Sequence, residues 1–368
     1  MKVVSVVDNR SQLLKALPVS RALETEHSEV LVYTGTEYET EIRGSFFESI
    51  DSPAPDVSLD VDSRPDSKQT AALLSALDDV VGTHQPDVVL VYGETNATLA
   101  GALVGAKRET VVAHVEAGLH RHDRDRPEEI DRILADHCRG ALFVPSERTK
   151  RVLEGDGISQ GVYNTGDVMY DSILSIRDQA RSSSTAPTSL DGITDDFVLA
   201  ALHRTSSLCN GDRLEAILRG FAASPRPVVL LSNPRLDDAL ARAGWLRTLP
   251  ANVIHFDRLD YLEYVGVVDQ ATCVATDSNR VQKEAFYVDT PCVTLRDSTA
   301  WIETVACGWN VLVGTESNAI ARNLERAFEL PTKPSPYGSG DAAGRIVSTL
   351  ASECLDADRG PQAEQVTI

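Results

Sequence analysis

Short runs of apolar, mostly β-branched residues alternate along the chain with amphipathic stretches. In the first half these runs are VVSVV (3–7), EVLVY (29–33), DVVLVY (87–92), TVVAHV (110–115) and ALFV (141–144). Nearly continuous apolar strands are typical of a parallel sheet that is covered by helices on both faces. The pattern therefore predicts an α/β fold with a parallel sheet.

The alternation stops at residues 181–194 and then begins again. This segment, RSSSTAPTSLDGIT, is rich in Ser, Thr and Pro and poor in bulky apolar residues, as linkers are. A chain of 368 residues also exceeds the size at which one core usually keeps growing. We therefore predict two Rossmann-like domains, residues 1–180 and 195–345, joined by this linker and followed by a C-terminal helix and acidic tail at 346–368.

The composition is strongly acidic. The chain carries 55 Asp and Glu against 35 Lys and Arg, for a formal net charge of -20, and only seven of the basic residues are Lys. Nucleic-acid binding needs clustered basic residues, so we expect no nucleic-acid partner. An acidic, Lys-poor surface suits a high-salt cytoplasm, where screening reduces self-repulsion, although an ordinary acidic bacterial protein remains an alternative.

Cofactor and targeting signals are missing from the sequence. The six cysteines are scattered without a CxxC pair, and no GxGxxG or GxxxxGK[ST] segment occurs, so we expect neither a disulfide framework nor a metal or nucleotide cofactor. The N-terminal MKVVSVVD is too short for a signal peptide, and no run approaches the ~18 apolar residues of a membrane span. We expect a cytoplasmic protein with no membrane partner.

Polar residues follow several of the predicted strands directly. In open parallel sheets ligands bind beyond the carboxyl ends of the strands, so these positions are the candidates for a site. Each of them could instead cap the next helix, and a lone histidine could be structural. The strand-end residues are Asp8–Asn9–Arg10, Gly93–Glu94, Glu116, His203–Arg204 and Asp277–Ser278.

Four segments together resemble one family of enzymes. They are HVEAGL (114–119), RPEEIDRILADH with LFVPSE (126–147), NTGDVMYD (164–171) and TDSNRVQKEA…VDTPCVTLRDSTAWIETVACGWNVLVG (276–314). The chain is similar in these segments, and from Val3 to about Gly344, to the UDP-N-acetylglucosamine 2-epimerase family. This resemblance implies two Rossmann-like parallel-sheet domains in the GT-B arrangement with an interdomain cleft.

The resemblance also implies a reaction at C2 of the sugar. Such enzymes eliminate UDP to leave a 2-acetamidoglucal and add UDP back with a proton on the other face, which interconverts UDP-GlcNAc and UDP-ManNAc for surface polysaccharide or glycan synthesis. No cofactor and no metal are implied, and a homodimer is. A hydrolysing enzyme or one acting on another UDP-sugar stays open, as does an inactive UDP-sugar-binding paralogue.

Carried over residue by residue, the resemblance assigns catalysis to three carboxylates and one histidine. The carboxylates are Glu94, Glu116 of HVEAGL and Glu128 of PEE, and His203 matches the family's HRxEN histidine. Carboxylates act as general acids and bases once burial or neighbouring anions raise their pKa. By contrast, HRHDRDR (120–126) between Glu116 and Glu128 is expected to be a solvated, partly self-neutralising loop.

The resemblance implies substrate-binding residues in the first half of the chain. Arg10 and Lys15 match the N-terminal Arg and Lys that face the phosphates or sugar, although Lys15 could simply belong to an amphipathic helix. Arg132, one turn after Glu128, is expected to orient that carboxylate.

In the second half, the implied binding residues would hold the nucleotide. Tyr264 takes an aromatic position beside the uracil, or alternatively packs in the core. Ser278 begins a helix whose N-terminal amides would face the diphosphate, and Glu284 matches the residue that grips the ribose hydroxyls. Asn279 and Arg280 replace two glycines of the family's DSGG segment, so that Arg280 either binds phosphate or blocks the site.

Other departures fall in the same segments. The family's GDT is GET here, so Glu94 is longer by one methylene than the usual Asp. Thr36 and Glu37 stand where the bacterial allosteric segment has Gln-His, so we expect no substrate activation of that kind. Three further replacements alter the HRxEN, HPR and PEEIN segments, at Ser206, Asn233 and Asp131 respectively.

Overall fold

The chain forms two compact units. The first comprises Met1–Ser172 together with Ser335–Ile368, and the second comprises Ile173–Pro334. No helix among the described residues is long and apolar enough to cross a membrane. The structure, a computed structural model, describes residues 1–35, 50, 54–61, 66–120, 125–138, 140–183, 196–325 and 330–357.

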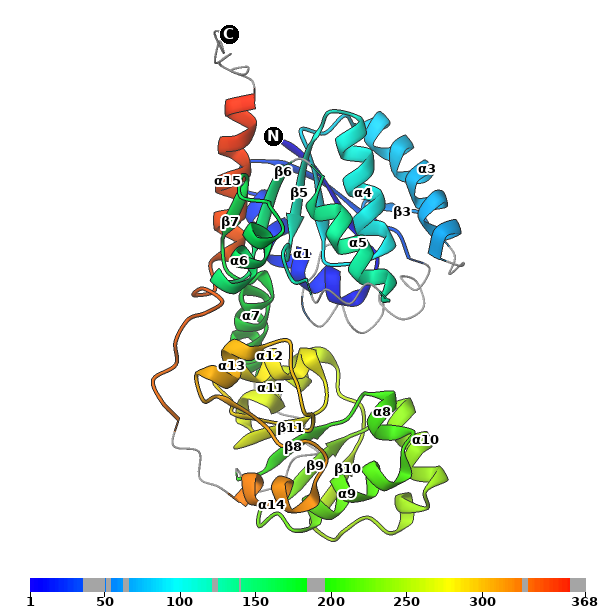
Figure 1. The fold of residues 1–368 in the computed structure, drawn as a ribbon, viewed down its shortest axis with the longest axis vertical. Helices are drawn as coiled ribbons and strands as arrows, with labels where there is room; N and C mark the ends of the chain where they lie inside the picture. Colours follow the sequence, from blue (N-terminus) through cyan, green and yellow to red (C-terminus); the bar gives the residue numbers. More distant parts are fainter. Residues whose placement is uncertain are drawn as a thin grey trace. The chain divides into compact units, whose positions relative to one another are not determined.

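The first unit is built on a seven-stranded sheet in which all paired strands are parallel (Figure 1). The order β3-β2-β1-β4-β5-β6-β7 reverses direction between β1 and β4, which makes their carboxyl ends the switch point where ligands bind in such sheets. The strands are β1 (Lys2–Val7), β2 (Ser28–Tyr33), β3 (Val57–Ser58), β4 (Val88–Tyr92), β5 (Val111–Val115), β6 (Gly140–Val144) and β7 (Val162–Asn164).

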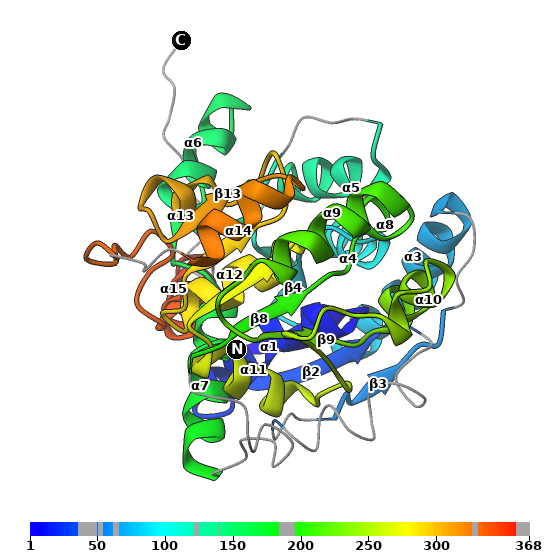
Figure 2. The same ribbon diagram turned by 90° about the horizontal axis from the view of Figure 1, so that it is seen from below.

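Helices cover both faces of this sheet. α3, α4 and α5 lie side by side on one face, whereas α1 and α15 pack together on the other (Figures 1 and 2). Right-handed crossovers explain the two faces, because the chain winds in opposite directions from β1 and from β4. The helices of this unit are α1 (Arg10–Leu23), α3 (Asp66–His84), α4 (Asn96–Lys107), α5 (Pro127–Asp136), α6 (Glu147–Gly155) and α15 (Ala342–Ala357). Helix α7 (Val168–Ser183) begins in this unit and continues into the second.

The second unit contains a six-stranded parallel sheet in the order β10-β9-β8-β11-β12-β13. Its strands are β8 (Val198–Ala201), β9 (Val228–Leu231), β10 (Val253–Phe256), β11 (Cys273–Thr276), β12 (Cys292–Thr294) and β13 (Asn310–Leu312). Its helices are α8 (Thr205–Leu208), α9 (Gly211–Ala222), α10 (Pro234–Arg242), η3 (Trp245–Arg247), α11 (Tyr261–Gln270), α12 (Asn279–Tyr287), α13 (Ile302–Ala306) and α14 (Ser317–Glu325).

The apolar strand runs are buried for the predicted reason. Every residue of β4 and of β8 is buried, since helices lie on both faces of each sheet. In the first unit, Val4, Val6, Val89 and Val91 pack with Leu77 of α3 in one continuous core. The prediction of two parallel-sheet Rossmann-like halves is confirmed by the two sheets.

The boundaries of the units differ from those read off the sequence. Helix α7 continues to Ser183, so residues 181–183 of the expected linker are helical, and 184–195 lie outside the described residues. The division falls instead at Ser172 and Ile173, and the chain returns to the first unit at Ser335. The cause is the apolar face of α15, which the sequence pattern assigned partly to the second domain.

Helix α15 is fixed to the first unit by a carboxylate as well as by packing. Asp171 accepts hydrogen bonds from the backbone N–H groups of Ala342 and Ala343, at 3.2 and 2.9 Å, and so caps the start of the helix. Ile346 and Leu350 on its inner face are fully buried. The helix therefore begins at Ala342 rather than at residue 346.

Candidate active site

Residues that follow three adjacent strands meet at the carboxyl edge of the first sheet. β1, β4 and β5 are neighbours and parallel, so the residues directly after them lie close together. Glu94 follows β4 after one glycine, and Glu116 follows β5. The predicted strand-end candidates of the first unit are thus brought to one edge.

Lys15 of α1 and Glu116 form a buried ion pair. The Lys15 side chain is 11% exposed and that of Glu116 is 6% exposed. Burial by itself would lower the pKa of Lys15, but the negative charges of Glu116 and Glu94 outweigh it and raise this pKa. Lys15 was predicted either to contact the ligand or to belong to an amphipathic helix surface. It is a charged group close to two of the candidate carboxylates.

Glu116 adopts an uncommon backbone conformation. Its φ is 68°, in the left-handed region that non-glycine residues seldom occupy. Such strain concentrates at functional sites, where the surrounding structure holds it in place. Gly93 also has a positive φ, and a Cβ placed there would lie 3.8 Å from Lys15 Nζ and 3.9 Å from Glu116 Oε2. The β4 loop, the β5 loop and α1 therefore converge at Gly93.

Arg132 contacts a different carboxylate from the one expected. Its guanidinium donates to Glu94 and, at 2.8 Å, to the carbonyl oxygen of Leu119. Glu128 lies at the first turn of α5 with its side chain 48% exposed and pairs with Arg126 at 3.2 Å. The expected Arg132–Glu128 contact is wrong because Arg132 belongs to the buried face of α5, which is turned toward the loop that carries Glu94.

The remaining first-unit predictions concern Arg10 and residues that the structure does not describe. Arg10 is the first residue of α1 and is exposed, and its proposed contact with phosphate or sugar stays a prediction. Thr36 and Glu37 lie outside the described residues, as do residues 121–124 of the loop between Glu116 and Glu128.

Gln12 is a residue that sequence reasoning missed. Its side chain is 2% exposed, accepts from the backbone N–H of Asp8 at 2.9 Å, and donates to the carbonyl oxygen of Tyr92 at 2.6 Å. It therefore links the ends of β1 and β4 at the switch point. The available signal was a polar residue on the apolar face of α1.

The loop after Glu116 is not uniformly solvated. His120, predicted to lie in a solvent-exposed loop, is 5% exposed, and its two ring nitrogens contact Asp136 and Asp156 at 2.7 and 2.6 Å. His114 contacts the same Asp136 at 2.6 Å and the carbonyl oxygen of Gly93 at 2.8 Å. The prediction failed for His120 because partners on α5 and at the end of α6, distant in sequence, compensate its burial.

In the second unit, a buried carboxylate joins two strand ends. Asp277, which follows β11 and is fully buried, accepts from the backbone N–H groups of His203 and Arg204 at 2.8 and 3.1 Å. Burial and the nearby charge of Arg280 lower the pKa of His203. The His203 ring is therefore favoured in its neutral form, able to donate one hydrogen bond and accept another.

Glu284 on α12 is held by two tyrosines. The phenol groups of Tyr261 and Tyr264 each donate to one of its carboxylate oxygens at 2.7 Å, and the two rings stack with centroids 5.8 Å apart. Arg280, one turn before Glu284, lies 3.4 Å from the same carboxylate. Tyr264 is thus a buried core residue with a polar contact, and its place beside a base stays a prediction.

The start of α12 is also tied to neighbouring segments. Asn279 accepts from the Arg296 side chain through Oδ1, and its carbonyl oxygen accepts from Trp301 Nε1 at 2.8 Å. Ser278 makes no side-chain cap to this helix. The side chains that replace two glycines are therefore turned, at Asn279, toward Arg296 and, at Arg280, toward Glu284.

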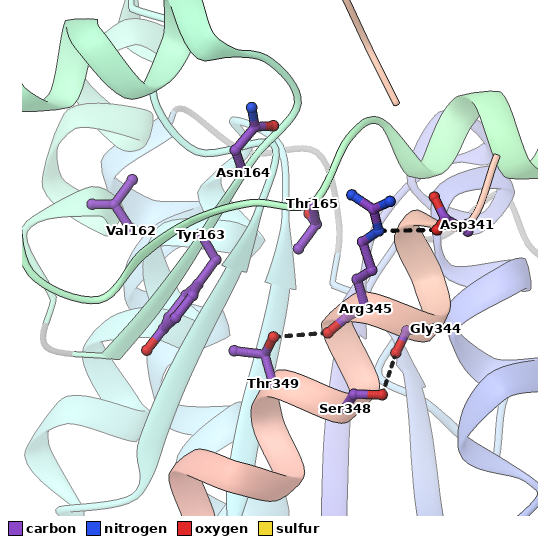
Figure 3. Close-up of a pocket in the computed structure, with 9 residues that line it drawn as sticks. All are labelled: Val162, Tyr163, Asn164, Thr165, Asp341, Gly344, Arg345, Ser348 and Thr349. Carbon is purple, nitrogen blue, oxygen red and sulfur yellow. Dashed lines mark hydrogen bonds and ion pairs between the residues drawn. The ribbon is translucent and has the colours of Figure 1, made fainter. Parts of the chain in front are cut away.

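The first unit also has two surface hollows, the second of which is lined in part by Asp136. One, of about 590 Å³, lies between β7 and the start of α15 (Figure 3), where Arg345 is paired with Asp341. Another, of about 1120 Å³, lies at the amino ends of β5 and β6. Neither is lined by a predicted site residue. Among the described residues no cluster of His, Cys, Asp and Glu is arranged to hold a metal ion.

Comparison with known proteins identifies the family of this chain. The family model described as UDP-N-acetylglucosamine 2-epimerase matches residues 21–351. The chain belongs to the UDP-N-acetylglucosamine 2-epimerase family. The resemblance read from the motifs HVEAGL and RPEEIDR is thereby confirmed.

Relatives within the family carry more than one substrate name. A protein of Methanococcus maripaludis named UDP-N-acetylglucosamine 2-epimerase homolog is 36% identical over 355 residues, which cover 95% of this chain and 99% of that protein. The UDP-2,3-diacetamido-2,3-dideoxy-D-glucuronate 2-epimerase of Pseudomonas aeruginosa is 37% identical over 361 residues, covering 95% of this chain and 99% of that protein. Epimerase family membership therefore leaves the UDP-sugar open.

A solved family structure shares the fold. The UDP-GlcNAc 2-epimerase of Methanocaldococcus jannaschii superposes with a TM-score of 0.85 at 32% identity, covering 96% of this chain and all of that chain. The predicted fold class, two Rossmann-like domains of the GT-B type, is confirmed.

Proposed function

We propose that this chain interconverts UDP-GlcNAc and UDP-ManNAc by elimination and re-addition of UDP. The observation that carries the proposal is the buried Lys15–Glu116 pair, set at the sheet's switch point with Glu94 beside it. Epimerisation at C2 needs a base that removes the C2 proton and a group that returns a proton to the other face. Two carboxylates, Glu116 and Glu94, with a cation between them supply such groups.

The proposed reaction keeps atoms and charge in balance. A carboxylate takes the proton from C2, the C1–O bond breaks, and UDP leaves with the bonding electrons to give a C1=C2 double bond. Return of UDP to C1 and of a proton to the opposite face of C2 completes the exchange. We assign the proton transfers to Glu94, Glu116 and Glu128, while Lys15 and Arg132 balance the charge of these carboxylates.

UDP is assigned to the second unit. His203, the N-terminal amides of α12 at Ser278 and the guanidinium of Arg280 would face the diphosphate. Glu284 would accept the ribose hydroxyls, and the two tyrosines on it leave lone pairs for this purpose, since a carboxylate accepts at about four sites. The solved M. jannaschii enzyme in complex with UDP-GlcNAc and UDP, 33% identical over 96% of this chain, supports a UDP-sugar ligand.

Isotope exchange with product analysis tests this function. The purified protein is incubated with UDP-GlcNAc in D2O at high salt, and we expect UDP-ManNAc with deuterium at C2 of both epimers. Free ManNAc with UDP would indicate the hydrolysing reaction instead. A rise of Tm with UDP-GlcNAc but no deuterium uptake would contradict an epimerase and leave a binding protein.

A second candidate substrate is a UDP-sugar related to that of the P. aeruginosa relative, which is as similar to this chain as the M. maripaludis protein is. A glucuronate carries a carboxylate, and Arg is the side chain that binds carboxylates in a fork. The exposed Arg10 at the start of α1 fits such a substrate. Comparing kcat/KM for UDP-GlcNAc and the diacetamido-glucuronate decides between the two, because a preference above about tenfold is a clear difference in transition-state binding.

We also propose a homodimer through α5. Ile130 and Leu134, one turn apart on this helix, are 44% and 47% exposed, and exposed apolar side chains that adjoin are typical of interfaces. Leu134→Glu should convert the dimer to a monomer in size-exclusion chromatography with light scattering. Ile302→Glu, at a similarly exposed residue of the second unit, is the control and should leave the mass unchanged. A wild-type monomer would contradict the proposal.

A further inference from the structure

A chain of hydrogen-bonded polar groups, buried except at its last member Asp156, adjoins the candidate carboxylates. It runs from the carbonyl oxygen of Gly93 through His114, Asp136 and His120 to Asp156. The side chains of His114, His120 and Asp136 are 0% exposed. We propose that His114 and His120 are both imidazolium ions that share Asp136, and that this assembly positions the two loops carrying Glu94 and Glu116.

Both ring nitrogens of His114 face acceptors. Nε2 lies 2.8 Å from the carbonyl oxygen of Gly93, which can only accept, so Nε2 carries a proton. Nδ1 lies 2.6 Å from Oδ1 of Asp136. When Asp136 is ionised this oxygen also accepts, so Nδ1 carries a proton too, and the ring is an imidazolium.

Asp136 is held in its ionised form. It accepts from His114 and His120, and its Oδ2 also accepts from the backbone N–H of Gly118 at 3.0 Å. Burial alone would raise the pKa of this carboxyl, but the charge and hydrogen bonds of His114, with those of His120 and Gly118, outweigh it and lower the pKa. Three hydrogen-bond donors therefore stabilise the ionised form of Asp136.

His120 lies between two carboxylates. Nε2 is 2.7 Å from Asp136 Oδ2 and Nδ1 is 2.6 Å from Asp156 Oδ2, at the C-terminal end of α6. Burial would lower the pKa of this histidine, yet Asp136 and Asp156 outweigh the effect and raise it. Cys138, just after α5, is another titratable group close to Asp136. Two imidazolium ions thus face two carboxylates.

The assembly reaches the chain next to each candidate carboxylate. Its contact at one end is the carbonyl of Gly93, the residue before Glu94, and Asp136 binds the N–H of Gly118, two residues after Glu116. Arg132, one turn earlier on α5, contacts Glu94 directly. Helix α5 therefore holds both loops through two residues. Arg132 contacts Glu94 and Leu119, and Asp136, one turn later, contacts His114 and Gly118.

This positioning role rests on the proposed 2-epimerase function, but the charge state does not. Uniform 15N labelling of histidine with NMR detection of ring nitrogens reports protonation directly. At pH 8, where a free histidine is neutral, we expect two rings with both nitrogens protonated. One such signal set should vanish in His114→Gln and the other in His120→Gln. A neutral ring at either position at pH 8 would overturn the proposal.

Kinetics test the positioning. Asp136→Asn keeps the shape but removes the shared charge, and we expect kcat for deuterium exchange to fall by about 100-fold, the effect of a small misplacement of reacting groups. KM and UDP binding should stay within about threefold, because UDP is assigned to the second unit. Equal changes in KM and kcat, or an unchanged kcat, would contradict a positioning role.

Asp237→Asn is the matched control. It disrupts another His–Asp pair, His255–Asp237 at 2.9 Å, which is partly exposed and lies in the second unit. It should leave kcat unchanged. If Asp136→Asn does not fold, as judged by circular dichroism, His120→Gln takes its place with the same expected kcat loss. Should wild type show no exchange on any UDP-sugar, the proposed function fails, while the NMR result still decides the imidazolium pair.

Discussion

Arg132 of α5 donates hydrogen bonds to the carboxylate of Glu94 and to the carbonyl oxygen of Leu119. One guanidinium therefore joins the loop after β4 to the loop after β5. Its Nε is buried and has no hydrogen-bond acceptor among the described residues. A buried donor without an acceptor costs stability, which is tolerated where a ligand supplies the missing oxygen.

Replacing Arg132 should therefore damage catalysis more than folding. In Arg132→Met the side chain keeps its length but loses its charge, so Glu94 loses its partner, and we expect kcat/KM to fall by roughly 100-fold, about the worth of a charge-assisted pair. The control is Arg181→Met, which breaks the Arg181–Asp269 pair, in which Arg181 is 58% exposed. Steady-state kinetics on both variants should show the loss at Arg132 alone. An equal loss in both would indicate a general effect of removing positive charge.

The Lys15–Glu116 pair should behave as one unit in catalysis. Glu116→Gln removes the proposed base while keeping its size, and we expect deuterium exchange to be abolished with UDP binding retained. Lys15→Met alone should also be severely impaired, and the double variant should be no worse than Glu116→Gln, because residues acting together are not additive. Exchange preserved in Glu116→Gln would remove this residue from the mechanism.

Arg280 should strengthen nucleotide binding. It lies 3.4 Å from Glu284 and its side chain is 41% exposed, so it can turn toward an incoming diphosphate. We expect Arg280→Gly to weaken UDP binding about tenfold in isothermal titration calorimetry. Arg219→Gly breaks a comparable pair four residues apart, Arg219–Glu215, and should leave UDP binding unchanged. Tighter binding in Arg280→Gly would mean that the guanidinium obstructs the site.

The sequence predicted the sheets because their signal is local. Runs such as 88–92 are apolar throughout and lie between amphipathic stretches and turns. They therefore predicted the parallel sheets and the position of Glu116 at the end of a strand. What the pattern could not supply was the partner of each polar residue. Arg132 is four residues from Glu128, but its contact is with Glu94, 38 residues earlier in the chain.

His120 shows the same limit more clearly. It stands among the charged residues of HRHDRDR, which indicates solvent exposure. Asp136 and Asp156, 16 and 36 residues later, compensate its burial. The end of α7 and the membership of α15 also depend on packing between distant segments. Non-local pairing of charge and of apolar faces is therefore what sequence reading missed here.

Asp131 gives a prediction for stability rather than catalysis. This residue, which stands where the related PEEIN motif has Asn, is 8% exposed. Burial, with the negative charges of Asp66 and Glu128, raises the pKa of its carboxyl to about 6. The unfolded carboxyl has a pKa of about 3.9, so the native state is penalised progressively as pH rises from 4 to 6 and fully above that range.

Asp131→Asn should therefore stabilise the protein at pH 8 by about 2 kcal/mol, since it removes a buried charge without changing volume. The gain should shrink toward zero near pH 4, where the wild-type carboxyl is protonated in both states. Urea unfolding of both proteins at pH 8 and pH 4.5 measures the difference. Asp238→Asn, at an exposed residue of α10, is the control and should change stability little at either pH. A gain at Asp131 that is equal at both pH values would show that its charge is not the cause.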